Sequence, residues 1–307
     1  MMTKIFVFAI TCVLPFLFIG IINKTKARWA GRKGASVFQP YYDFLKLLRK
    51  GEVISKTTSF ILKIAPSVNI AAALFAMLFI PIPFIGSIIH FPGDFIVFTY
   101  TLGLAKFMLV LAALDTGSSF EGMGASREVT FSTLVEMAFF IVLGTLALLT
   151  NQISFEAIFA MLTVSAGYSL LVKILLVASL FIMLLAEGSR VPVDDPNTHL
   201  ELTMIHEVMI LDYSGPDLAF MVYAAGMKMM LIAMLIANLC IPPYFPSIAA
   251  LCLFFGVLIF IYIAVGAVES LIARSRMSHV PQFIFLMTAL SLTAFAVVAF
   301  FLRGGLS

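Results

Sequence analysis

The stretch PSIAALCLFFGVLIFIYIAVGAVESLI, residues 246–272, contains a single charged residue, Glu269. A helix needs about 20 mostly apolar residues to cross the roughly 30 Å hydrocarbon core of a bilayer. Because lipid offers the backbone no hydrogen-bond partner, a run of this length satisfies its own peptide groups as a helix. This stretch therefore predicts a transmembrane helix.

Runs of this kind recur at about 3–22, 66–86, 94–114, 129–150, 156–186, 217–240, 246–272 and 281–302. The fifth run exceeds one perpendicular crossing and is kept as one helix, either tilted or broken near Gly167. Only 11% of the 307 residues are charged, where a soluble domain carries about a quarter. The sequence predicts an all-α, polytopic membrane helix bundle with about eight transmembrane helices, folded as a single domain over residues 1–307.

Lysine and arginine in short loops mark the cytoplasmic side of a membrane protein. The loop after the first run holds ten of them: Lys24, Lys26, Arg28, Arg32, Lys33, Lys46, Arg49, Lys50, Lys56 and Lys63. Later loops on that side add Arg127, Arg190, Arg274 and Arg276, and the opposite side keeps only Lys4 and Arg303. This predicts a multi-pass protein of the inner, cytoplasmic membrane with both termini on the outer side.

The basic loop also contains an amphipathic segment at residues 40–50. Its apolar side chains recur at helical spacing, at Tyr41, Phe44, Leu45 and Leu48, while Asp43, Lys46 and Lys50 occupy another side. This pattern predicts a short helix lying at the membrane surface.

An acidic loop follows the fifth run. Asp195 suits an N-cap and Pro196 a first helical position, so a second surface helix is expected from there to Leu211. In that helix His199 and His206 stand two turns apart, about 10 Å, too far to chelate one metal ion. They predict a polar face toward a partner. Residues 122–124, Gly-Met-Gly, are expected to form a tight turn.

Several charges fall inside the apolar runs: Lys106, Glu136, Lys173 and Lys228, with Glu187 and Glu269 near inside ends. A charge at the bilayer centre costs roughly 2.5–3.5 kcal/mol on insertion scales. We therefore expect these groups to face one another across the bundle, as Lys–Glu pairs or around water. The alternative is snorkelling of the lysines to the interface, which suits Lys228 better than Lys106 or Lys173. The sequence leaves the pairing open.

Three segments on the predicted inside carry a family pattern. They are GASVFQPYYDFLKLLR at 34–49, FEGMGASRE at 120–128, and LAEGSRVPVDD at 185–195 continuing through HEVMILDYSG at 206–215. Together, and in this order, they resemble the H-type (heel) membrane subunit of respiratory complex I and of membrane-bound nickel–iron hydrogenases.

The three segments resemble the hydrogenase branch more closely, which includes formate hydrogenlyase, hydrogenase-4 and energy-converting hydrogenases. The complex I heel usually shows LAETNRTPFD, where this chain has Gly188 and Ser189, and a Ser-Tyr-Glu where it has 129–132, VTFS. These departures weaken the expectation of a quinone pocket.

The resemblance implies a non-catalytic subunit of an oxidoreductase complex that anchors a peripheral redox arm and couples it to proton or sodium movement. Hydrogenase large and small subunits, iron–sulfur subunits, antiporter-like membrane subunits and the lipid bilayer are the expected partners, and nucleic acid is not. The nickel–iron centre and iron–sulfur clusters are expected in those partners. The three cysteines lack CxxC spacing, so this chain is expected to hold no metal or cofactor.

Two residue sets follow from charge, loop position and the resemblance together. The ion-coupling set is Glu128, Glu136, Glu187, Asp194, Asp195, Glu201, Glu207, Lys106 and Lys173, and the partner-docking set is Asp43, Arg49, Arg127 and Arg190. Three alternatives remain open at this point. They are a complex I heel with a quinone site near Asp43 and Arg190, a passive anchor, and a secondary transporter, which would carry inverted repeats and broken midplane helices.

Overall fold

The computed structural model describes residues 2–162, 167–194, 204–242, 247–273 and 276–304. Within these ranges, eight helices are long and apolar enough to cross a membrane. They are α1 (Met2–Trp29), α3 (Phe60–Met77), α4 (Asp94–Asp115), α5 (Ser119–Thr150), α7 (Gly167–Glu187), α8 (Gly215–Cys240), α9 (Ser247–Leu271) and α10 (Val280–Gly304). The predicted all-α membrane bundle is confirmed.

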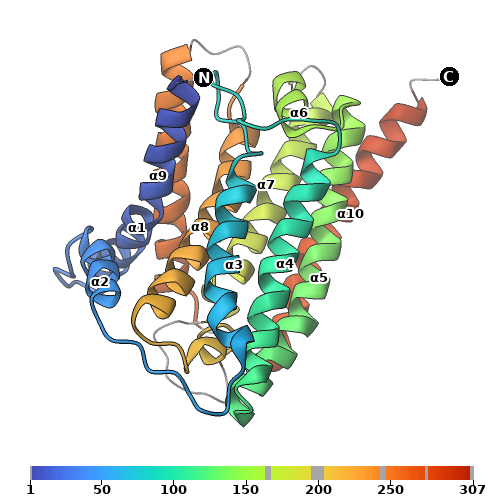
Figure 1. Cartoon of the computed structure of the whole chain (residues 1–307). Helices are drawn as coiled ribbons and strands as arrows, with labels where there is room; N and C mark the ends of the chain where they lie inside the picture. The colour runs from blue at the N-terminus through green and yellow to red at the C-terminus, as the bar shows by residue number, and fades with distance from the viewer. Residues whose placement is uncertain (1, 163–166, 195–203, 243–246, 274–275, 305–307) are drawn as a thin grey trace.

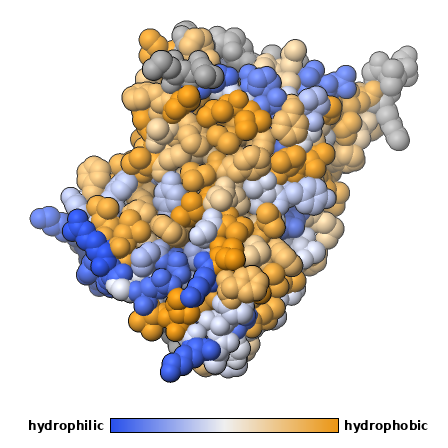
Figure 2. Space-filling view, in the orientation of Figure 1, coloured by the Kyte–Doolittle hydropathy of each residue, from blue (hydrophilic) through white to orange (hydrophobic). Residues whose placement is uncertain are grey.

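The long helices stand side by side, and α1 begins at the end of the bundle where α10 finishes (Figure 1). Helix α8 is central: it packs against α1, α3, α7 and α9, and nearly every residue of its second half is buried. Helix α10 packs on α5 and α7, while α1 packs on α9. Apolar atoms form a belt around the visible face, with hydrophilic atoms gathered toward its ends (Figure 2).

The second span is displaced from the predicted 66–86. It begins at Phe60, because the Ser59 side chain accepts a hydrogen bond from the backbone N–H of Ile61 and caps the helix. Pro66 lies inside this helix and does not begin it. The span ends at Met77, and residues 78–93 form an irregular connection that contains three prolines, at 81, 83 and 92.

The fourth span begins ten residues before the predicted 129, at Ser119. The expected tight turn at 122–124 is wrong, because both glycines lie within α5. A Cβ atom on Gly124 would stand 2.3 Å from Val208 Cγ1 and 3.0 Å from the carbonyl oxygen of Ile205, whereas one on Gly122 would meet nothing within 4 Å. Gly124 thus lets the segment 204–212 lie directly against α5.

The fifth run is divided, where the sequence prediction kept it whole. Its first part forms the short helix α6 (Phe155–Met161), and its second forms α7. Leu162 lies outside both helices, and its carbonyl oxygen accepts a hydrogen bond from Lys173 Nζ at 3.0 Å. The ammonium group therefore occupies an acceptor that the end of α6 leaves open.

The amphipathic segment forms α2 (Gln39–Leu48), which confirms the predicted short helix. The second predicted surface helix, 195–211, is only partly accessible to comparison, because residues 195–203 lie outside the described ranges. For residues 204–211 the predicted α-helix is wrong, since Glu207–Ile210 form a single 3₁₀ turn, η1. A second such turn, η2 (Met277–His279), precedes α10.

We predict opposite effects for two alanine substitutions in α5. Gly122→Ala should leave thermal stability unchanged or raise it, because alanine favours helix by about 1 kcal/mol over glycine. Gly124→Ala should lower stability by about 1–3 kcal/mol, because the added methyl overpacks the contact with Val208. The measurement is the temperature at which detergent-purified protein loses monodispersity. Equal stability of the two variants would contradict the close packing of 204–212 on α5.

Candidate functional site

Four charged side chains from four helices form a continuous chain of ion pairs. Lys106 of α4 lies 3.2 Å from Glu136 of α5 and 2.8 Å from Glu187 at the end of α7. Lys228, in the middle of α8, lies 3.0 Å from the second carboxylate oxygen of Glu187. Glu187 is therefore shared by two ammonium groups, which compensate its charge where water is scarce.

Burial changes along this chain. The Glu187 side chain is 6% exposed and that of Lys106 is 10% exposed, whereas the Glu136 side chain is 41% exposed. Glu136 lies 14 residues from the end of α5 at Thr150, about 21 Å along the helix. The chain of ion pairs thus runs from the interior to the lateral surface of the bundle.

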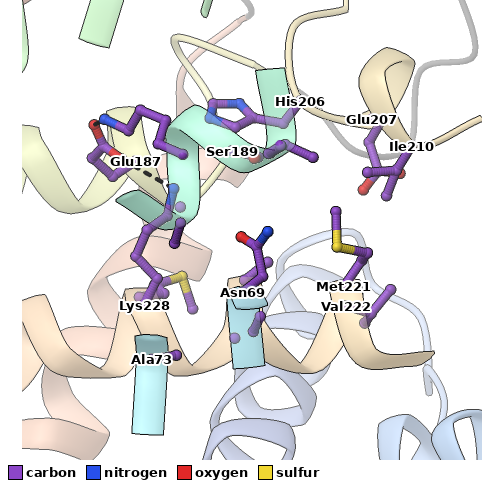
Figure 3. A pocket seen from close by; sticks show the side chains of 18 of the residues that line it. Asn69, Ala73, Glu187, Ser189, His206, Glu207, Ile210, Met221, Val222 and Lys228 are labelled. Carbon is purple, nitrogen blue, oxygen red and sulfur yellow. Dashed lines mark hydrogen bonds and ion pairs between the residues drawn. The ribbon is translucent and has the colours of Figure 1, made fainter. Parts of the chain in front are cut away.

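A cavity of about 290 Å³ adjoins the buried end of the chain. Lys228, Met221 and Val222 reach it from α8, and Asn69 points into it from α3 (Figure 3). Glu207 and Ile210 of η1 close the side away from Glu187 (Figure 3). The lining is mixed, because these charged and amide groups alternate with alanine and leucine side chains.

His206 also lines the cavity, and it lies between two carboxylates. Its Nε2 is 3.1 Å from Glu128 of α5, and its Nδ1 is 3.5 Å from Asp194, which follows α7. Burial by itself would lower the pKa of His206, but the two carboxylates outweigh it, so the pKa is raised above its usual range although nearby Lys228 opposes this. His206 is therefore held in a site that favours its protonated form.

The segment that carries His206 is fastened to the first turns of α5. Arg127 Nη1 donates to the carbonyl oxygen of Met204 at 2.9 Å, and Glu121 accepts from the backbone N–H of Asp212 at 3.1 Å. Asp194 accepts from the backbone N–H groups of residues 205 and 206. Together with the glycine contact at 124, these bonds make 204–212 a wall between α5 and the cavity.

A third ionic group lies toward α1 and α9. Glu269 of α9 has no exposed side-chain surface and pairs with Lys26 at 2.9 Å and with Arg190 at 3.4 Å. Arg190 follows α7, so this group ties the α7–α8 connection to α9. The pairing satisfies a carboxylate that the sequence alone left without a partner.

The predicted coupling residues are partly brought together. Lys106, Glu136 and Glu187 form one cluster, Glu128 and Asp194 meet at His206, and Glu207 lines the cavity. Lys173 lies apart, about 21 Å along α7 from Glu187, beside a main-chain carbonyl. Asp195 and Glu201 lie outside the described residues. The coupling role of the whole set stays a prediction.

The predicted docking residues differ in placement. Asp43 and Arg49 are exposed on α2 and its C-cap. Arg127 is half-buried with its guanidinium turned to Met204, and Arg190 is buried against Glu269. The Arg190 guanidinium faces the interior and cannot contact a partner directly. It could support a docking surface only indirectly, through its ion pair with Glu269.

Sequence reasoning placed three site residues outside its coupling set. For Lys228 the sequence left pairing and snorkelling open, and the structure pairs its ammonium group with Glu187. His206 was assigned to a partner-facing surface, and Glu269 received no role. Lys228 and Glu269 could have been found as charges within apolar runs, and His206 as a titratable residue in the predicted inside loop. Among the described residues, no group of three His, Cys, Asp or Glu side chains is arranged to hold a metal ion.

Fold and site define a class: a multi-pass membrane protein with clustered ion pairs beside a cavity. A family model described as NADH dehydrogenase matches residues 2–299, so the chain belongs to that family. It is 32% identical to hydrogenase-4 component C of Escherichia coli (strain K12) over 238 residues, 76% of this chain and 73% of that protein. Formate hydrogenlyase subunit 4 of the same organism is 27% identical over 231 residues, 75% and 74% of the two chains.

A solved structure shows the same fold. A chain of the membrane-bound sulfane sulfur reductase (MBS), an archaeal respiratory membrane complex, superposes with a TM-score of 0.82 over 96% of this chain and 98% of that chain. Its sequence identity is 20%. The predicted resemblance to the complex I family, closest to the hydrogenase branch, is confirmed.

We predict that His206 makes the clamp on α5 sensitive to pH. Because the pKa of His206 is raised in the folded protein, its stabilisation is complete below the unfolded value of about 6.5 and is lost as pH rises through the folded value. Thermal stability should thus fall more between about pH 6 and about pH 9 in the wild type than in His206→Gln. His279→Gln, at an exposed histidine, is the control and should keep the wild-type slope. Identical slopes in the wild type and His206→Gln would contradict the clamp.

Proposed function

We propose that this chain anchors the peripheral arm of a membrane-bound nickel–iron hydrogenase complex and couples its redox reaction to proton or sodium movement. The chain of ion pairs Glu136–Lys106–Glu187–Lys228 carries the proposal. Alternating acids and bases at 2.8–3.2 Å can change charge state in sequence without leaving a lone charge in the bilayer. The family assignment and the two hydrogenase relatives support the type of complex.

The membrane and the orientation are part of the proposal. Eight spans return the chain to the side on which it began, and α1 starts where α10 ends (Figure 1). The basic segment 24–63 begins at the other end of α1, where Lys26 and Arg28 stand in the last turn. By the positive-inside rule, that end faces the cytoplasm, and both termini face outward from the cytoplasmic membrane.

The exposure of Glu136 supports the proposal that a neighbouring membrane subunit covers this face. A carboxylate that is 41% exposed at mid-bilayer depth is unfavourable against lipid. On the same face, Tyr100, Phe107 and Met137 are exposed. An antiporter-like subunit that covers this face and offers a polar group to Glu136 would extend the chain of ion pairs beyond this protein.

The peripheral partners belong at the cytoplasmic end, close to the wall 204–212. The hydrogenase large and small subunits and the iron–sulfur subunits would dock there and hold the nickel–iron centre and the clusters. Glu207 and His206 lie between this face and the cavity, so a partner that moves the wall would change the surroundings of Glu187. This is how redox chemistry in the arm would reach the membrane charges.

The cavity favours one second function, a quinone site. It is partly apolar, and Asn69, Lys228 and Arg190 could hydrogen-bond carbonyl oxygens. Asp43 is not among its lining residues, so the site would differ from the one that the sequence suggested. Hydrogen-dependent quinone reduction by the purified complex would favour this function over coupling without quinone.

We predict that Glu187→Gln abolishes ion movement but not hydrogen activity. The substitution leaves Lys106 and Lys228 facing a neutral amide, and removing one partner of a buried ion pair costs about 3–5 kcal/mol. Inverted membrane vesicles should retain hydrogen evolution while acidification, followed with a pH-sensitive dye, or sodium uptake falls to background. Glu52→Gln, at an exposed carboxylate, is the control. Wild-type ion movement in assembled Glu187→Gln and Glu136→Gln complexes would overturn the proposal.

A further inference from the structure

The chain returns along α1 after leaving it. A Cβ atom on Gly34 would lie 2.3 Å from that of Ala27, and one on Gly20 would lie 1.9 Å from the carbonyl oxygen of Val37. Only a glycine at position 20 leaves room for the backbone of Val37 to lie this close to α1. Farther on, the Tyr41 hydroxyl donates to the carbonyl oxygen of Val13. Residues 34–41 therefore run antiparallel to α1 toward its middle.

This return places α2 at membrane depth. The ring of Phe44 lies 4.9 Å from that of Phe16 in α1 and 5.9 Å from that of Tyr223 in α8. Phe16 is 12 residues from Lys4 near the start of α1, about 18 Å of helix, within the roughly 30 Å of a bilayer core. The outward side of α2 therefore lies at the boundary with lipid rather than on a face projecting into the cytoplasm.

The outward side of α2 carries an apolar stripe that ends in a cation. Phe38, Tyr42 and Leu45 succeed one another at helical spacing and are 53%, 61% and 51% exposed. One turn beyond Leu45 stands the exposed Arg49 at the C-cap. Lys46, one turn after Tyr42, is also exposed. Hydrophilic and hydrophobic atoms accordingly lie next to each other in the part of Figure 2 that α2 occupies in Figure 1.

We propose that this stripe and its two cations form a binding site for an anionic phospholipid. The acyl chains lie against Phe38, Tyr42 and Leu45, and the phosphate is held by Arg49, whose planar guanidinium can donate two parallel hydrogen bonds, and by Lys46. Long basic side chains at such a boundary extend toward the headgroups while their stems cover apolar surface. The acidic residue of α2, Asp43, accepts a hydrogen bond from Gln39 Nε2 at 2.9 Å.

Depth and composition favour lipid over a protein partner. The exposed apolar stripe lies between the packed side of α2 and its basic side, an order that suits a helix whose outer face meets acyl chains and whose basic side chains reach toward headgroups. A water-soluble arm would meet only the basic edge and leave the stripe uncovered. The site is independent of the ion pairs at Glu187 and does not rest on the proposed function. It assigns Arg49, predicted to dock a protein, to a lipid phosphate.

The test uses a fluorescent reporter on the stripe. The sequence has one tryptophan, Trp29, so Tyr42→Trp in a Trp29→Phe background gives a single tryptophan at the site. The full-length chain is reconstituted in phosphatidylcholine nanodiscs containing brominated phosphatidylglycerol or, at equal mole fraction, brominated phosphatidylcholine. Brominated phosphatidylglycerol should be preferred over brominated phosphatidylcholine by up to about 25-fold, as read from quenching of the tryptophan, and this preference should fall by about fivefold for each of Lys46 and Arg49 that is replaced by glutamine.

Two further arms make the result decisive. Lys56→Gln/Lys63→Gln removes the same charge from exposed positions away from α2 and should keep the preference. Equal quenching by the two lipids would overturn the proposal, as would loss of preference in this control. Protection from both lipids in the assembled complex would show instead that a protein covers α2.

If the reporter variant fails to fold, a second measurement replaces it. Copurifying phosphatidylglycerol is counted by mass spectrometry on chains that retain Trp29 and Tyr42. That count should fall with Lys46→Gln/Arg49→Gln, and an unchanged count would overturn the proposal.

Discussion

A carboxylate shared by two ammonium groups is the constraint on which this bundle depends. Glu187 ends α7, Lys106 comes from α4 and Lys228 from α8, so one acid fixes the relative position of three helices. In a medium of low dielectric constant, leaving any one of these charges unpaired costs far more than it would in water. The central placement of α8 follows, because its midpoint must reach the end of α7.

The same constraint gives the cavity its character. Charges that meet at Glu187 hold polar groups at the edge of an apolar interior, and Asn69 and His206 add further hydrogen-bonding atoms around the same space. The wall 204–212 separates this space from α5 and is itself held by Glu121, Arg127 and, through His206, Glu128. A change in charge at His206 in the wall therefore acts directly on Glu187, because buried charges are screened weakly.

The spans could be predicted from sequence because hydrocarbon leaves a long apolar run few choices. The ends of the spans could not be predicted where tertiary contacts replace lipid. The polar residues 119–128, for example, are helical and pack against 204–212, which is far away in the chain. The ionic residues were visible as misfits in apolar runs. Their partners were not, because pairing depends on how each helix is rotated and tilted. Lys228 illustrates this, since the sequence left both pairing and snorkelling open, whereas in the folded bundle its ammonium group meets Glu187.

The exposure of Glu136 has a consequence for biogenesis. An orphan copy of the chain presents this carboxylate sideways to acyl chains, with Lys106 as its described counter-charge. A charge at such depth costs roughly 2.5–3.5 kcal/mol, and a neighbouring subunit that covers it removes that cost. In the proposed complex, unassembled copies would thus be the less stable population in the membrane, and their turnover would keep the stoichiometry of that complex without a dedicated sensor.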